Sequence, residues 1–217
     1  MYPAGNLFIP AEHGRLEAIL KEPRGGSVNG VALVLHPHPL GGGTMHNKVT
    51  FRAAAALNDA GLITLRINFR GVGQSTGQHD EGQGELDDVR TGLDYLSEHY
   101  AGQPITLCGF SFGARVGLEV GISDDRVVNL ISIGTPVGKY DFGFLEACAK
   151  PILFVHGDRD EFGSVQALEV LIGKIKLHNP SVESRVVQDA GHFFEGHLDA
   201  LKAAIAEWME RQLKIDK

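Results

Sequence analysis

Cysteine is scarce in this sequence of 217 residues, which contains only Cys108 and Cys148. Cys108 lies within an apolar, strand-like segment, and Cys148 lies beside the junction of a helix-like and a strand-like segment. Two thiols in a chain of this size favour reduced side chains, because small secreted proteins that depend on disulfides carry several cysteine pairs. We therefore expect a cytoplasmic protein.

Positive charge is also in short supply, since 20 Lys and Arg residues stand against 27 Asp and Glu residues and give a formal net charge of −7. Nucleic acids and anionic membrane surfaces are bound through clustered Lys and Arg side chains. The sequence contains no such cluster. We therefore expect neither a nucleic acid nor a membrane as a partner.

Long apolar runs are missing as well, and no stretch of 18 apolar residues occurs that would predict a membrane span. The first six residues, Met1 to Asn6, do not begin the basic and then apolar pattern of a secretory signal peptide. There is no internal repeat, and the only linker-like segment is a short turn at Gly25-Gly26-Ser27. With 43% hydrophobic residues, the sequence predicts a single domain over residues 1–217.

Two kinds of pattern alternate along the chain. Residues 6–10 and 14–20 alternate apolar and polar residues around Glu12-His13-Gly14, which predicts an antiparallel hairpin. Further strands are expected at 31–35, 63–67, 105–108, 127–133, 152–155 and 184–187, and helices at 48–60, 85–99, 114–121, 166–177 and 198–213. Strands that alternate with helices predict an α/β fold, with a mostly parallel central sheet and helices on both faces.

The most informative segment is Gly109-Phe110-Ser111-Phe112-Gly113, which lies between an expected strand and an expected helix. In this context G-x-S-x-G is typical of a sharp strand-to-helix turn that presents a nucleophilic serine. The glycines remove side chains that would collide in such a turn. The pattern is short enough to occur by chance, so other residues must support it.

A serine hydroxyl needs a base to take its proton and a third group to orient that base. Residues 156–160 (HGDRD) follow the expected strand at 152–155 and contain Asp158 and Asp160. Residues 190–194 (AGHFF) follow the expected strand at 184–187 and contain His192. Active sites of parallel sheets gather at this carboxyl edge.

These motifs, together with residues 36–43 (HPHPLGGG) and 68–75 (NFRGVGQS), make the chain resemble the α/β-hydrolase superfamily over nearly its whole length. It is similar in particular to the small, lidless, dienelactone-hydrolase-like bacterial branch. The resemblance implies a catalytic triad of Ser111, Asp160 and His192 and a reaction without a cofactor. The family's G-x-x-D spacing, here from Gly157, favours Asp160 over Asp158.

Acyl transfer also needs N–H donors that bind the oxyanion of the intermediate. The N–H of Phe112, which follows the serine at a helix N-terminus, is one candidate. The second donor should come from residues 36–43, where the two prolines have no N–H. Aligned on the family's His-Gly-x loop, the chain implies the N–H of His38. Proline stands in place of the family's glycine, so the N–H of Leu40 stays an alternative.

Several other polar residues have a structural interpretation that we prefer. His36, His38 and His46 could suggest a metal site, but they lack an acidic or cysteine partner, and no metal is expected. Arg70 could bind an anionic substrate, but a pair with Glu85, Asp87 or Asp88 is favoured. His156 and Asp189 are expected to be loop residues without a role in the reaction. His79 and His197 are expected on the surface, although either could lie at the rim of the pocket.

The segment from Thr135 to Lys150, where larger relatives insert a lid, has room for one short helix only. An open site favours small or medium soluble substrates. The phenylalanines at 110, 112, 193 and 194 are expected around the nucleophile and the base, where they either pack in the interior or form a pocket for an apolar acyl group. The expected function is that of a serine carboxylesterase acting on a small-molecule ester. A peptidase, thioesterase or acyltransferase with the same triad is an alternative, as is a non-catalytic small-molecule receptor.

Overall fold

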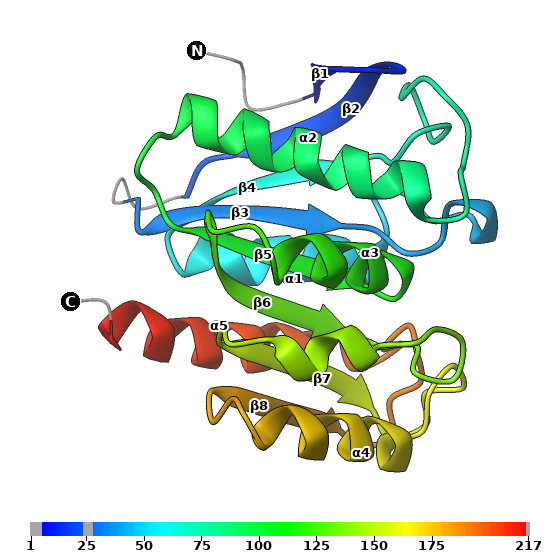
Figure 1. The fold of residues 1–217 in the computed structure, drawn as a ribbon, viewed down its shortest axis with the longest axis vertical. Helices are drawn as coiled ribbons and strands as arrows, with labels where there is room; N and C mark the ends of the chain where they lie inside the picture. The colour runs from blue at the N-terminus through cyan, green and yellow to red at the C-terminus, as the bar shows by residue number, and fades with distance from the viewer. Residues whose placement is uncertain (1–5, 24–27, 216–217) are drawn as a thin grey trace.

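The computed structural model describes residues 6–23 and 28–215 (Figure 1), so the turn expected at Gly25-Gly26-Ser27 lies outside the described residues. The strands are β1 (Asn6–Ala11), β2 (Gly14–Lys21), β3 (Gly30–Leu35), β4 (Leu62–Ile67), β5 (Ile105–Phe110), β6 (Val127–Ile133), β7 (Ile152–Gly157) and β8 (Val182–Val187). The helices are α1 (Lys48–Asp59), α2 (Gln83–His99), α3 (Phe112–Gly121), α4 (Val165–Lys176) and α5 (Leu198–Ile215), with short 3₁₀ helices η1 (Pro39–Gly41) and η2 (Gly143–Ala147).

The eight strands form one sheet in the order β1-β2-β4-β3-β5-β6-β7-β8. The hairpin of β1 and β2 is antiparallel, and β2 pairs antiparallel with β4. All the pairs from β4 through β3 and β5 to β8 are parallel. The predicted α/β fold is therefore confirmed, including the opening hairpin.

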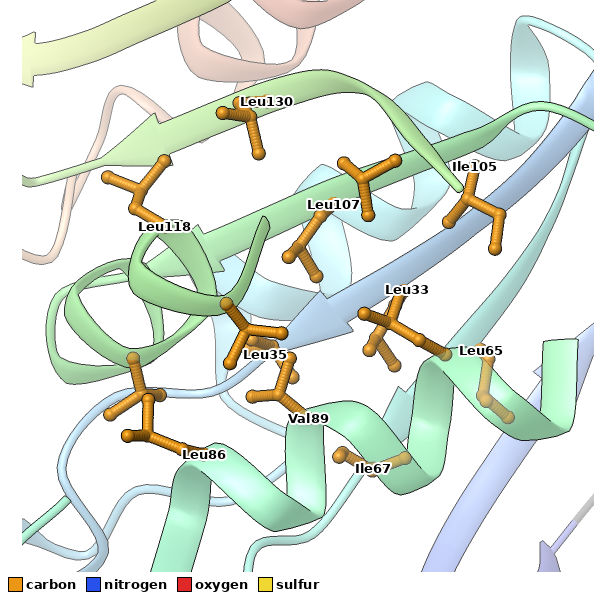
Figure 2. Close-up of a cluster of buried hydrophobic side chains, with 14 of the residues drawn as sticks. Leu33, Leu35, Leu65, Ile67, Leu86, Val89, Ile105, Leu107, Leu118 and Leu130 are labelled. Atoms are coloured by element: carbon orange, nitrogen blue, oxygen red, sulfur yellow. The ribbon is translucent and has the colours of Figure 1, made fainter. Parts of the chain in front are cut away.

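Helices cover both faces of the sheet (Figure 1). On one face α2, α3 and α4 pack on Leu33, Leu35, Leu107 and their neighbours, part of which Figure 2 shows. On the other face α1 and α5 pack on Ala32, Val34 and further residues. Successive side chains of a strand point to opposite faces, so a strand buried on both sides has a continuous apolar sequence. This explains why the inner strands do not alternate with polar residues.

Helices α2 and α3 each begin two residues earlier than the apolar pattern predicts. Helix α3 starts at Phe112, directly after Ser111, because the chain reverses at that serine. Helix α2 starts at Gln83 because the Glu85 carboxylate folds back and accepts hydrogen bonds from the N–H groups of Gly82 (2.8 Å) and Asp80 (3.1 Å). Such a cap satisfies N–H groups that have no partner within the helix.

The strand order changes direction beside β3, since the chain passes from β3 to β4 on one side and then to β5 on the other. The loops that follow β3 and β5 therefore diverge at the carboxyl edge of the sheet, which is where α/β sheets bind ligands. The segment between β6 and β7 contains only the short helix η2, as expected. None of the described helices has the length and apolar character needed to cross a bilayer.

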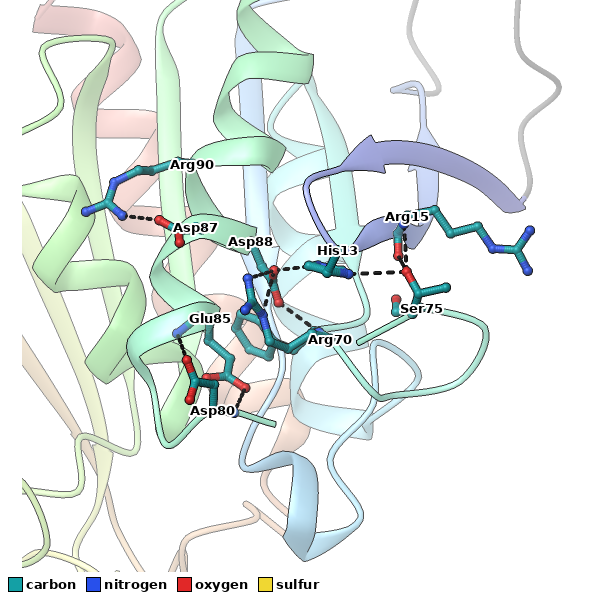
Figure 3. A network of polar contacts seen from close by, with 12 residues as sticks. His13, Arg15, Arg70, Ser75, Asp80, Glu85, Asp87, Asp88 and Arg90 are labelled. Atoms are coloured by element: carbon teal, nitrogen blue, oxygen red, sulfur yellow. Dashed lines mark hydrogen bonds and ion pairs between the residues drawn. The ribbon is translucent and has the colours of Figure 1, made fainter. Parts of the chain in front are cut away.

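Arg70 has a structural partner, which confirms the preferred interpretation. Its guanidinium donates to Asp88 through Nε (3.1 Å) and Nη2 (2.9 Å), and its backbone N–H donates to the same carboxylate (2.8 Å). His13, from the β1–β2 hairpin, contacts Asp88 from the other side at 3.0 Å (Figure 3). The buried Asp88 carboxylate thus joins the hairpin, the loop after β4 and helix α2.

Replacement of this carboxylate should destabilise the fold. We expect Asp88→Ala to lower the free energy of unfolding by about 3 kcal/mol, because it leaves a half-buried guanidinium without its partner. The control is Asp87→Ala, which removes an exposed pair with Arg90 on the same helix and should cost less than about 1 kcal/mol. Urea unfolding of both variants measures the difference, and equal losses would contradict the role given to Asp88.

Candidate active site

Ser111 lies at a strained turn between β5 and α3. Its backbone has φ +56° and ψ −116°, and its N–H donates to the carbonyl of Ile133 at 2.9 Å. Glycines on both sides allow this geometry. A Cβ on Gly109 would overlap the backbone of Gly113, and a Cβ on Gly113 would lie 2.5 Å from the carbonyl oxygen of His36. The turn predicted from G-x-S-x-G is therefore present.

A chain of two hydrogen bonds connects Ser111, His192 and Asp160. The Nε2 atom of His192 lies 2.8 Å from Ser111 Oγ, and its Nδ1 atom lies 2.8 Å from Asp160 Oδ2. Since an ionised carboxylate only accepts hydrogen bonds, Nδ1 carries the proton of the neutral ring. Nε2 is then free to accept the serine proton. His192 and Asp160 are both buried.

The loops after β7 and β8 hold the imidazole in place. Asp160 Oδ1 accepts a hydrogen bond from the N–H of Phe162 at 2.8 Å, and the N–H of His192 donates to Glu161 Oε2 at 3.2 Å. The rings of Phe110 and Phe162 lie 5.0 and 4.5 Å from the His192 ring. A Cβ on Gly134 would lie 3.1 Å from the imidazole, so only glycine leaves it this space.

The competing acidic residues are placed elsewhere. Asp158 is exposed, and its carboxylate has no hydrogen-bond partner within the described part of the chain. Asp189 is exposed and forms an ion pair with Arg159. Only Asp160 therefore contacts His192, although all three aspartates belong to the same two loops.

His36 and His156 stabilise the loops at this edge of the sheet through hydrogen bonds to backbone groups. His36 is buried: its Nδ1 donates to the carbonyl of Pro37 (2.6 Å) and its Nε2 accepts from the N–H of Phe69 (3.0 Å). Burial lowers the pKa of His36 to about 4. His156 donates through Nε2 to the carbonyl of Gly163 at 2.7 Å. His36 has no free ring nitrogen for a metal, and the described residues include no cluster of three metal-ligating side chains.

Some backbone N–H groups of the loop after β3 have a hydrogen-bond acceptor within the protein, and others do not. That of Leu40 donates to His38 Nδ1 at 3.2 Å. Those of Gly41 and Gly43 donate to the carbonyl of His38, and that of Gly42 donates to the carbonyl of Pro39. The N–H groups of His38 and Phe112 have no acceptor among the described residues. Between the two candidates from the loop, this geometry favours His38 over Leu40 as an oxyanion donor.

A cavity of about 290 Å³ surrounds Ser111 and His192, and its walls include Phe112 and Phe193. Three of its side chains, which the sequence analysis did not single out, are Lys139, Tyr140 and Phe162. Lys139 Nζ lies 3.8 Å from the centre of the Phe162 ring. These residues come from the loops after β6 and β7 and carry no local motif, so only the fold brings them together.

Two further expectations concern the aromatic rim. Of the two interpretations of Phe194, packing is the one observed, since its side chain is fully buried between the sheet and helices α1 and α5. His79 is half-buried and lines a neighbouring cavity of about 700 Å³ with His38 and Phe112. A second neighbouring cavity, of about 580 Å³, shares Asn47 and Phe193 with the pocket.

Comparisons with known proteins identify relatives of this chain. A family model described as an alpha/beta hydrolase domain matches residues 30–210. An uncharacterized protein of Rickettsia prowazekii is 34% identical over 210 residues, which cover 94% of this chain and 87% of that protein.

Solved structures are similar over nearly the whole chain. An alpha-beta serine hydrolase homologue from Coxiella burnetii is 37% identical with a TM-score of 0.88, and the match covers 95% of this chain and 98% of that one. A serine hydrolase without a lid from Xanthomonas campestris is 32% identical with a TM-score of 0.88, covering 98% and 97% of the two chains.

The close approach at the serine turn gives a testable difference between two glycines. We expect Gly109→Ala to lower the free energy of unfolding by about 3 kcal/mol, because the new methyl group overlaps the start of α3. Gly173→Ala is the control, since Gly173 lies on the exposed side of α4 with open space around it. Alanine there should stabilise the helix by about 0.5–1 kcal/mol. Chemical denaturation measures both, and a tolerated Gly109→Ala would contradict the steric argument.

Proposed function

The chain belongs to the alpha/beta hydrolase family, and we propose that within it the protein acts as a serine carboxylesterase with Ser111 as nucleophile, His192 as base and Asp160 as orienting acid. The observation that carries the proposal is the unbroken hydrogen-bond chain from Ser111 Oγ through His192 to Asp160. A hydroxyl, an imidazole and a carboxylate in this order are the groups that serine acyl transfer needs.

In the proposed reaction, Ser111 Oγ attacks the ester carbonyl while His192 Nε2 takes the hydroxyl proton. The N–H groups of Phe112 and His38 bind the negative oxygen of the tetrahedral intermediate. The intermediate collapses to an acyl-enzyme as His192 returns the proton to the leaving alcohol. Water then attacks the acyl carbon with His192 as base, and the carboxylic acid leaves Ser111.

The surroundings of the serine indicate the size and polarity of the ester. A pocket of about 290 Å³ accommodates a small or medium group around the scissile bond. Phe110, Phe162 and Phe193 border His192 with apolar rings. A small-molecule ester is therefore the proposed substrate, with the two neighbouring cavities available for longer limbs.

We also propose that the protein works in a reducing compartment such as the cytoplasm. Cys108 and Cys148 are both free and buried, and burial raises the pKa of both thiols. Thiols of this kind are unreactive, so neither cysteine competes with Ser111 as a nucleophile.

The role of Ser111 predicts that Ser111→Ala loses about 10⁶-fold in kcat on a p-nitrophenyl ester. Asp160→Asn should lose about 10⁴-fold, because the amide no longer holds the imidazole in the required tautomer. Asp158→Asn is the matched control from the same loop and should retain the wild-type rate. Steady-state kinetics of the three variants measure these differences.

The nucleophile can be identified independently with a fluorophosphonate probe, which should label wild-type protein on Ser111 and leave Ser111→Ala unlabelled. Full activity of Ser111→Ala, or wild-type protein that neither labels nor cleaves esters, would refute the proposal. Turnover of a thioester or anilide in preference to the matching ester would move the assignment to another acyl-transfer reaction.

A further inference from the structure

The cavity of about 700 Å³ beside the reactive pocket contains two imidazoles that the proposed reaction does not use as side chains. They belong to His38 and His79. The cavity shares His38, Phe112 and Tyr140 with the pocket around Ser111, so the two spaces are direct neighbours. A substrate limb that extends from the serine on this side must pass the two imidazoles.

The hydrogen bond of the His38 ring fixes its tautomer. The backbone N–H of Leu40 donates to His38 Nδ1 at 3.2 Å, so Nδ1 is an acceptor and carries no proton. The ring proton therefore lies on Nε2. Burial is the largest of the causes that lower the pKa of His38, and this agrees with a neutral ring. His38 thus offers the cavity an N–H donor.

His79 has the opposite tautomer when it is neutral. Its Nδ1 lies 2.8 Å from Glu85 Oε1, and the Glu85 carboxylate is fully buried at the start of α2. Figure 3 shows Glu85 held there beside Asp80. Because the carboxylate can only accept, the proton of His79 lies on Nδ1. Nε2 of His79 is then a hydrogen-bond acceptor.

The two rings are neighbours. Their centres lie 5.0 Å apart, and they lie 4.9 Å (His38) and 5.6 Å (His79) from the ring of Phe112. Neither Nε2 atom has a hydrogen-bond partner among the described residues. Neither Nε2 atom is completely buried. Both atoms therefore keep some accessible surface, and both rings line the same cavity.

A neighbouring N–H donor and ring-nitrogen acceptor match one group above all, a hydroxyl, which accepts one hydrogen bond and donates another. We propose that His38 and His79 bind a hydroxyl group on the acyl limb of the substrate, and that His79 thereby determines specificity. The inference rests on the proposed esterase function. The acyl limb is assigned to this side because the leaving oxygen must reach His192, which lies beside Phe193 and the other neighbouring cavity.

Three p-nitrophenyl 3-arylpropanoates that differ only at the para position of the acyl ring test this proposal. The substituent is hydrogen, hydroxyl or methoxy, and the leaving group is constant. We expect kcat/KM of the hydroxyl ester to exceed that of the unsubstituted ester about tenfold, as for a well-placed hydrogen-bonding group. The methoxy ester can accept but not donate, so it should gain little. Equal gains for methoxy and hydroxyl would overturn the assignment of His79 as an acceptor.

Variants of His79 separate its binding role from its structural one. His79→Asn keeps an N–H near Glu85 but removes the acceptor at Nε2, and His79→Phe keeps a ring against Phe112. In both we expect the ratio of kcat/KM between the hydroxyl and unsubstituted esters to fall from about ten to about one. His178→Gln, on the exposed surface, is the matched control and should keep the wild-type ratio. Thermal unfolding verifies that each variant is folded.

The outcomes distinguish the two proposals. If Ser111 is labelled by the fluorophosphonate and the unsubstituted ester is cleaved without any preference for the hydroxyl ester, the hydroxyl site is refuted and the esterase stands. A preference that survives in both folded His79 variants also refutes the site. If no ester is cleaved and Ser111 is not labelled, the esterase proposal fails and the hydroxyl site fails with it.

Discussion

The rest of the site depends on the close approach of backbone to backbone around Ser111. Gly109 and Gly113 let the start of α3 lie directly against β5 and the end of β3, and Ser111 then adopts a positive φ between them. This one contact starts the helix at Phe112, leaves the N–H of Phe112 without an internal acceptor, and directs Oγ toward His192. Strain of this kind persists only where the surrounding structure enforces it.

Buried polar side chains hold the loops and the start of α2 near the candidate site. His36 joins the loop after β3 to Phe69, Asp88 joins the loop after β4 to helix α2, and Glu85 caps α2 while it holds His79. Such groups are costly to bury without partners, so each favours one arrangement of its loop. The polar residues that shape the candidate site are therefore also residues on which the fold depends.

The sequence predicted every strand and α-helix named above to within a few residues. The buried strands are short continuous apolar runs, and the helices repeat apolar residues every three or four positions, so both patterns are easy to recognise. The sequence also favoured Asp160 over Asp158 through its spacing from Gly157, and only Asp160 contacts His192. The family resemblance favoured His38, but Leu40 stayed an alternative because their N–H groups lie two residues apart and only the backbone conformation of η1 separates them. Lys139, Tyr140 and Phe162 were not predicted, because only the conformation of their loops brings them to the serine. The sequence also could not decide whether Phe194 packs in the core or lines the pocket, because that depends on which way its loop turns.

The short connection between β6 and β7 has a chemical consequence for the proposed reaction. This segment contains only the short helix η2 and adds Lys139 and Tyr140 to the pocket wall, so no inserted helical lid lies over Ser111. Water is then always the most abundant acceptor at the acyl-enzyme. An enzyme that transfers acyl groups to another alcohol or amine must shield this intermediate from water, so a half-buried serine without a lid favours hydrolysis of the acyl group.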